Sequence, residues 1–195
     1  MPYALAAGDV AGAVVTIVKD GKVLVVKGYG YADVKKRSPV DPQTTLFRQA
    51  SVSKLFTATA VMQWVEAGST PAYSNYGVAL AGYIVERVSG QPFEEYVEQR
   101  IFQPLGMRYS TFRQPLPKPL APYMAQGYRQ ASTTARPFEI LGRAPPGALS
   151  ASGADMARFM LAHLNRGELN GRRILAAETA DRMHDTPTDM IPPLS

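Results

Sequence analysis

The chain has 195 residues, 46% of them hydrophobic and 19% charged, and it contains no cysteine. The apolar share excludes a disordered chain, and the absence of cysteine excludes disulfides, thiolate nucleophiles and cysteine-based zinc sites. The net charge of +5 comes from scattered basic residues, and no aromatic residues interleave with the densest group, Lys35-Lys36-Arg37. We therefore expect one domain over residues 1–195 that binds no nucleic acid and, with only two histidines, uses no metal or cofactor.

Long hydrophobic segments are missing from the sequence. The longest apolar runs stay well below the ~18 residues that a transmembrane helix needs, so we expect no membrane span. The chain starts without a basic region, and Asp9 interrupts its short Ala-rich stretch, so we expect no signal peptide. The sequence leaves the cellular compartment open.

Residues 12–31 are expected to form a β-hairpin. Two segments rich in β-branched residues, 13–18 and 23–26, are joined by Lys19-Asp20-Gly21-Lys22, and Asp-Gly between such segments is a strong hairpin signal. An isolated hairpin is marginally stable and has an open edge. We therefore expect two copies of the chain to form a homodimer by pairing such edges.

The clearest helix is expected from Ser51 to Ala67, with Ser51 as its N-cap and Gly68 after its end. Its apolar residues spread around most of the circumference, which predicts a buried central helix. Further helices are expected over residues 77–89, from Pro92 onward, over 153–165 and over 176–184, and residues 121–150 are expected to form a long irregular loop. In the first of these helices one apolar stripe is expected, made of Val78, Ala81, Ile84, Val85 and Val88. In the second, the residues expected to face inward are Phe93, Tyr96, Val97 and Ile101. With the hairpin, these helices indicate an α+β fold.

Ser51 and Lys54 are the first candidates for chemistry, because their spacing places both side chains on one helix face. Free N–H groups and the positive end of the helix dipole at this position can stabilise an oxyanion. The dipole and an apolar setting both favour the neutral amine of Lys54, which could then accept the proton of the serine. The alternative is a capping serine beside a lysine that reaches solvent.

Tyr73 and Asn75 form a second candidate group, in the segment Tyr73-Ser74-Asn75. A tyrosine beside a cation can act as base or acid, and an asparagine can orient a substrate amide. The alternative is an ordinary turn, which favours the same residue types.

Other polar residues are expected to be structural. His163 and His184 lie on or near helix ends, and Glu86 is expected on a solvated helix face. Ser152 and Asp155 have the spacing of an acidic capping box, in which the serine caps the helix that follows.

The ordered segments resemble the serine β-lactamase-related family, which includes class C β-lactamases, DD-peptidases and β-lactamase-like carboxylesterases. The resemblance extends from Gly8 to about Met183 and rests on residues 51–68, 73–77, 84–93 and 101–107. It implies a β-lactamase/transpeptidase-like fold, of which this chain holds the helical region and the N-terminal hairpin. It also implies a serine hydrolase that acts through an acyl-enzyme on an amide, β-lactam or ester carbonyl of a small molecule or peptide.

The same resemblance implies roles for four residues. Ser51 would be the acylated nucleophile, Lys54 its proton partner and Tyr73 the general base and acid. Asn75 would contact the substrate or Lys54, and the Ser51 N–H would donate half of the oxyanion hole. Members of the family are often exported or periplasmic.

The sequence departs from this family in its third motif. No lysine or histidine begins a triplet with Thr or Ser and then Gly, and we expect the C-terminal sheet strands that would follow residue 185 to be missing. The alternative function is therefore a catalytically weak or inactive binding or scaffold member, or a fragment, of the same fold. Whether the substrate is a lactam, a D-amino peptide or an ester remains open.

The spacing between Lys54 and Tyr73 is also unusually short. A helix from Ser51 to Ala67 spans about 24 Å, and the six links from Ala67 to Tyr73 reach at most roughly 20 Å. Three explanations remain open: a shorter helix, a tyrosine supplied by a second copy, or a missing segment near residues 68–71. We favour the third.

Overall fold

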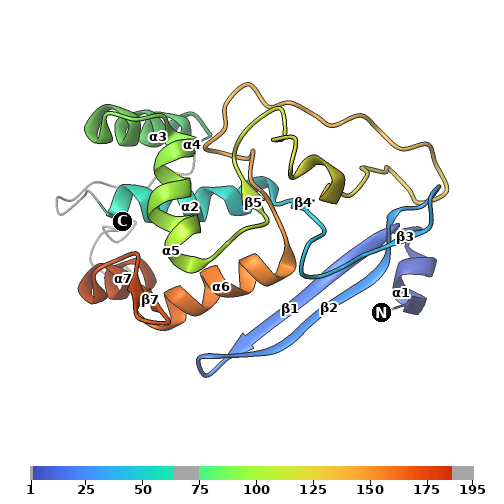
Figure 1. The fold of residues 1–195 in the computed structure, drawn as a ribbon, viewed down its shortest axis with the longest axis horizontal. Coiled ribbons are helices and arrows are strands. Elements are labelled where there is room, and N and C mark those ends of the chain that lie inside the picture. Colours follow the sequence, from blue (N-terminus) through green and yellow to red (C-terminus); the bar gives the residue numbers. More distant parts are fainter. Residues whose placement is uncertain (1, 64–74, 186–195) are drawn as a thin grey trace, which may run out of the picture.

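The computed structural model of this chain describes residues 2–63 and 75–185, which form helices and small sheets. The helices are α1 (Pro2–Ala7), η1 (Ala50–Val52), α2 (Ser53–Met62), α3 (Asn75–Ser89), α4 (Phe93–Val97), η2 (Glu98–Phe102), α5 (Gln103–Leu105), η3 (Ala121–Tyr123), α6 (Gly153–Leu164) and α7 (Ala177–His184). The strands are β1 (Gly12–Lys19), β2 (Lys22–Asp33), β3 (Ser38–Pro39), β4 (Phe47–Arg48), β5 (Ser110–Thr111), β6 (Ser150–Ala151), β7 (Glu168–Leu169) and β8 (Arg172–Arg173). In Figure 1 the hairpin β1–β2 lies along one side of a group of helices.

The N-terminal hairpin has the antiparallel pairing that its sequence predicts, from Gly12 opposite Gly30 to Lys19 opposite Lys22. Asp20 and Gly21 both have positive φ (49° and 69°), as a two-residue turn matched to the strand twist requires. β3 adds a short third strand beside β2.

Helix α6 packs on one face of this hairpin (Figure 1). Thr16 Oγ1 of β1 donates a hydrogen bond to the Gly153 carbonyl at 3.1 Å. A Cβ at Gly153 would lie 2.2 Å from Val14 Cγ1, so only glycine allows this close approach. The hairpin is therefore held by the start of α6.

A second small sheet joins distant parts of the chain in the order β4-β6-β5. Phe47 pairs with Ala151, and Ser110 pairs with the other edge of the same residue. This sheet places the residues that precede Ser51 next to the segment that leads into α6.

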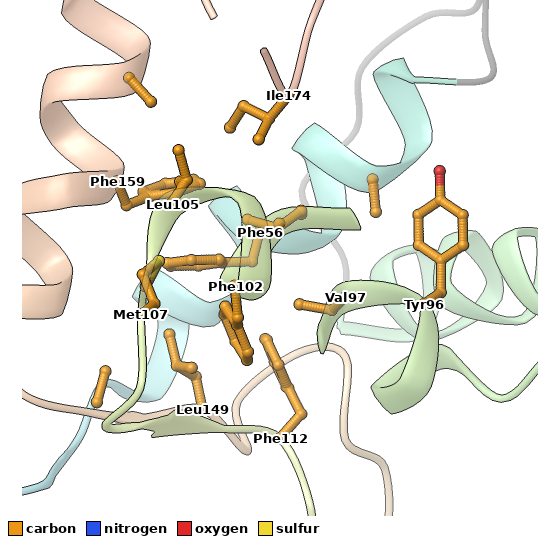
Figure 2. Close-up of a cluster of buried hydrophobic side chains, with 14 of the residues drawn as sticks. Phe56, Tyr96, Val97, Phe102, Leu105, Met107, Phe112, Leu149, Phe159 and Ile174 are labelled. Carbon is orange, nitrogen blue, oxygen red and sulfur yellow. The ribbon is translucent and has the colours of Figure 1, made fainter. Parts of the chain in front are cut away.

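Phe56 of α2 lies at the centre of the hydrophobic core (Figure 2). Its ring stacks on Phe159 of α6, with ring centroids 3.7 Å apart, and it meets Phe102 and Phe112 edge to face. α2 thus packs against both α6 and the α4–α5 region. The apolar residues expected to face inward from Pro92 onward are confirmed as buried: Phe93, Tyr96, Val97 and Ile101.

The expected all-round burial of the first helix is wrong. Phe56 and Ala60 are buried, but Leu55 is 53% exposed. α2 also ends at Met62, earlier than expected, while residues 64–67 lie outside the described residues.

Two expectations for α3 and its surroundings also need correction. Val85 is buried, but Ile84 and Val88 of the predicted apolar stripe are about half exposed. Glu86, expected to be solvated, accepts a hydrogen bond from the Phe93 N–H at 3.0 Å and so caps α4. Among the described residues, no helix combines the length and hydropathy needed to cross a bilayer.

Candidate active site

The turn that carries Ser51 is held by the neighbouring segment 149–151. Gln49 N–H donates to the Leu149 carbonyl at 2.9 Å, and Leu149 N–H donates to the buried Ser53 hydroxyl at 3.2 Å. Gln49 Nε2 also lies 3.3 Å from the carbonyl oxygens of Phe47 and Ala151. These bonds fix both flanks of Ser51 while its own side chain stays exposed.

Ala50, directly before Ser51, has a left-handed backbone with φ of 45°. This conformation costs an L-residue roughly 1–2 kcal/mol. Such strain persists only where the surroundings enforce it, and it is frequent at functional sites. The sharp turn presents Ser51 at the surface, in front of α2.

Lys54 reaches back to Ser51, as the spacing of the two residues predicts. Its Nζ lies 2.8 Å from Ser51 Oγ, which is hydrogen-bonding distance. Lys54 is half-buried, and Ser51 is exposed. The arrangement therefore combines an accessible hydroxyl with a basic group within proton-transfer range.

Ser51 is not the N-cap of the helix, contrary to expectation. Val52 holds that position, and no side chain caps α2. The first hydrogen bond of the turn runs from Val52 N–H to the Gln49 carbonyl, so the N–H of Ser51 takes no part in it. An N–H beside the serine hydroxyl, at the start of a helix, can donate to an oxyanion.

Tyr73, the third candidate, lies outside the described residues. Asn75 is the first residue of α3, and its side chain is likewise not described. Because α2 ends at Met62, the chain between Lys54 and Tyr73 is no longer too short for Tyr73 to return to Ser51. The helix spans about 15 Å, and the eleven links from Met62 to Tyr73 can cover up to roughly 36 Å.

A hydrogen-bonded chain behind the site connects α2 to α6 and α7. Thr59 Oγ1 donates to the Leu55 carbonyl at 2.8 Å and lies 3.1 Å from His163 Nε2. His163 Nδ1 lies 3.1 Å from His184 Nε2. Because the Thr59 proton is already used, the neutral His163 ring donates through Nε2 and accepts at Nδ1.

Burial, and to a smaller extent the neighbouring His184, lower the pKa of His163 to about 4. His163 is therefore neutral near pH 7. This agrees with the structural role expected for both histidines.

Two grooves in the described part of the chain lie away from the Ser51–Lys54 pair. One, of about 500 Å³, is lined by residues that include Tyr109 and Arg158, and the other, of about 370 Å³, is lined by residues that include Thr111 and Pro117. Neither is lined by Ser51 or Lys54. Within residues 2–63 and 75–185, no three acidic or histidine side chains group to hold a metal ion.

The residues that hold the turn at Ser51 were not predicted from the sequence. Ser53, Thr57 and Thr59 are fully buried polar residues, and Thr57 Oγ1 donates to the Pro145 carbonyl at 2.9 Å. The available signal was three small hydroxyl residues in an otherwise apolar helix. The strain at Ala50 had no such signal, because the residue type does not reveal it.

The family model and the curated relatives that match this chain agree with one another. The family model described as Beta-lactamase matches residues 3–70 and 64–190. PbpX of Bacillus subtilis, named as a penicillin-binding protein, is 26% identical over 184 aligned positions, which cover 63% of this chain and 46% of that protein. Beta-lactamase-like protein 2 of Dictyostelium discoideum is 37% identical over 97 positions, 48% of this chain and 17% of its own length.

A solved structure supports the fold. The octameric penicillin-binding protein homologue from Pyrococcus abyssi matches with a TM-score of 0.76 at 23% identity, covering 98% of this chain and 59% of its own. The chain spans about half the length, or less, of the curated relatives described above.

Proposed function

The chain belongs to the Beta-lactamase family, and on that premise we propose that it is a serine hydrolase that forms an acyl-enzyme on Ser51. The observation that carries the proposal is the 2.8 Å contact between Lys54 Nζ and Ser51 Oγ on an exposed turn. A lysine in the first turn lies at the unfavourable end of the helix dipole, so its place beside the hydroxyl needs a reason other than helix stability. Activation of a nucleophile supplies that reason.

In the proposed reaction, Ser51 Oγ attacks the carbonyl carbon of the substrate while its proton passes to Lys54 Nζ. The negative charge on the substrate oxygen is stabilised by the Ser51 N–H. The tetrahedral intermediate then collapses, the C–N or C–O bond breaks, and the leaving amine or alcohol takes up a proton. Water hydrolyses the resulting ester of Ser51, releases a carboxylic acid and restores the hydroxyl.

Tyr73 and Asn75 complete the proposed machinery. Tyr73 would deliver the proton to the leaving group and activate the water, and Asn75 would hold the substrate amide or Lys54. This assignment follows the family resemblance. Its support in the structure is that the short helix α2 leaves enough chain for Tyr73 to return to Ser51.

The proposed substrate is a small molecule or peptide with an amide, β-lactam or ester carbonyl. The names of the relatives, one a penicillin-binding protein and one a β-lactamase-like protein, point to lactams. Ser51 is exposed, so amide, β-lactam and ester carbonyls can all reach it among the described residues.

The decisive experiment screens a penicillin, a D-Ala-D-Ala peptide and a short-chain p-nitrophenyl ester with wild type and Ser51→Ala in parallel. We expect turnover or stable acylation by at least one substrate, lost to background in Ser51→Ala. Peptide mapping should place the adduct on Ser51. An adduct on another residue, or turnover that survives in Ser51→Ala, would refute the proposal.

A non-catalytic binding protein of the same fold is the second candidate. It predicts no turnover of any of the three substrates and a ligand affinity that Ser51→Ala leaves unchanged. Clear wild-type turnover that requires Ser51 excludes it.

We also propose that the chain lacks an internal segment of its relatives. The 184 positions aligned with the Bacillus subtilis relative contain about 123 residues of this chain (63% of 195), so about 61 positions face a gap. The two parts of the family match meet at residues 64–70, between Lys54 and Tyr73. An intact mass of 21.2 kDa for the protein isolated from its natural source would show that these residues are truly contiguous.

A further inference from the structure

The groove of about 500 Å³ lies at the start of α6. Four separate segments line it: the loop that carries Gln43, the turn from α5 to Tyr109, the first turns of α6, and the β7–β8 connection at Leu169 and Asn170. All of its lining residues lie between positions 43 and 170, so the groove is formed within the body of the chain. Its volume is in the range of sites that take small-molecule ligands.

The charged side chains of this groove are two arginines, Arg108 and Arg158, and one acid, Asp155. Asp155 is 1% exposed. Its carboxylate accepts hydrogen bonds from Tyr109 N–H, Ser110 Oγ and Arg158 Nη1, so its oxygens are already engaged by the protein. The charge that faces solvent in the groove is therefore positive.

Arg158 is held in position by Asp155. Its Nη1 lies 2.8 Å from Asp155 Oδ1, while the side chain stays 42% exposed. This bond uses one of the five N–H groups of the guanidinium, and the others make no hydrogen bond within the described part of the chain. A planar guanidinium fixed in this way has lost its freedom before a ligand arrives, which raises the affinity for that ligand.

Arg108 and three amide side chains also offer unused donors to the groove. Arg108 is exposed, and its side chain forms no ion pair or hydrogen bond with residues 2–63 or 75–185. The same holds for the side-chain amides of Gln43, Gln103 and Asn170. The groove thus gathers N–H donors from three of its four segments, together with the fixed fork of Arg158 on the fourth.

We propose that this groove binds a small carboxylic acid, with its carboxylate on Arg108 and Arg158 and its carbon chain against Pro104 and Leu169. A guanidinium meets the two oxygens of a carboxylate in a planar, two-point contact. Two arginines and one aspartate leave a net charge of +1, which a monocarboxylate balances and a phosphate dianion exceeds. The apolar lining residues favour an anion with a carbon body over an inorganic ion. This inference does not depend on the proposed hydrolysis.

Titration of the isotope-labelled chain with hexanoate, followed by NMR at constant ionic strength, tests the site. We expect saturable shifts of the backbone signals of Tyr109 and Arg158. Hexanamide, which has a similar shape but no charge, should bind at least about tenfold more weakly, and hexyl phosphate should also bind more weakly than hexanoate. Equal binding of hexanamide, tighter binding of hexyl phosphate or the absence of saturable shifts would overturn the proposal.

Arg108→Gln is the decisive variant, because the exposed side chain of Arg108 supports no described contact and the fold should not change. We expect its Kd for hexanoate to rise about tenfold. Arg158→Lys keeps the charge but loses the planar fork, and its Kd should rise to a similar extent. Arg129→Gln is the matched control, since Arg129 is exposed and lines neither groove, and its Kd should stay unchanged. An unchanged Kd in Arg108→Gln, or an equal rise in Arg129→Gln, would show that no specific site exists.

Discussion

Two serines precede helices in this chain with the same spacing to a charged residue, and they are used in opposite ways. Ser152 is fully buried, and its hydroxyl accepts a hydrogen bond from the Asp155 N–H at 3.2 Å, so it caps α6. Ser51 is exposed and caps nothing, and its hydroxyl contacts Lys54 at 2.8 Å.

The sign of the charge three residues later separates the two cases. An acid in the first turn is stabilised by the helix dipole, and Asp155 also accepts hydrogen bonds from Tyr109 N–H (2.6 Å) and Ser110 Oγ (3.0 Å). A base in the first turn gains nothing from the dipole. The serine beside an acid therefore serves the fold, and the serine beside a base is available for chemistry.

Replacing Lys54 is expected to have the largest effect, a loss of acylation at Ser51. Lys54→Met should lower the acylation rate of Ser51 by about 10²–10⁴, the usual range for loss of a proton-transfer group. Unfolding free energy should stay the same or rise by a few tenths of a kcal/mol, because a cation leaves the helix N-terminus. Stopped-flow acylation and chemical denaturation measure the two effects.

Lys54→Arg is the matched control for this variant. Arginine keeps the charge but cannot accept a proton near pH 7. We expect the same loss of acylation as in Lys54→Met. Retained activity would mean that Lys54 acts only through its positive charge.

At the other helix, Asp155→Asn should lower the unfolding free energy by about 1–3 kcal/mol, because it weakens the hydrogen bonds that the buried carboxylate accepts from Tyr109 N–H and Ser110 Oγ. Burial raises the pKa of Asp155, although its hydrogen bonds and Arg158 act in the opposite direction. The folded fraction of Asp155→Asn should acylate at the wild-type rate. A normal unfolding midpoint in urea would contradict this assignment.

The contact between α2 and α6 through Thr59 and His163 should weaken in acid. The pKa of His163 is lowered from 6.5 to about 4 by burial, so between these values the unfolded chain binds more protons than the folded chain. Stability should therefore fall as pH decreases through this window, by up to ~1.4 kcal/mol per pH unit. His163→Gln should flatten that part of the pH profile, and an unchanged slope would show that other groups produce it.

The smallest expected effect compares the two serines directly. Ser152→Ala should lower the unfolding free energy by about 1 kcal/mol, the usual effect of losing an N-cap. Ser51→Ala should change it by less than about 0.5 kcal/mol, because that hydroxyl is exposed and caps no helix. Thermal unfolding of both variants distinguishes a capping serine from a chemical one.

Much of the local structure could be predicted because it depends on near neighbours. The Asp20-Gly21 turn, the capping by Ser152 and the contact of Ser51 with Lys54 all involve residues within a few positions of each other. The inward residues of the α4–α5 region were likewise predictable from helical spacing.

The sequence predictions were wrong where burial or hydrogen bonding depends on distant parts of the chain. Leu55, Ile84 and Val88 are apolar and fit helical stripes, yet no described element covers them. Glu86 caps α4 only because the connection at Gln91 and Pro92 brings Phe93 N–H to it. Spacing within one helix cannot reveal whether a second element lies against it.

The sequence by itself determined which hydroxyl could meet which amine, because a separation of three residues on one turn leaves little freedom. Only the tertiary structure decided how that hydroxyl is presented. The segment 149–151 bonds to both flanks of the turn and holds Ala50 in a left-handed conformation, so Ser51 projects to the surface rather than capping α2. The physical reason is that such strain is sustained by bonds between residues about one hundred positions apart, which no local pattern records.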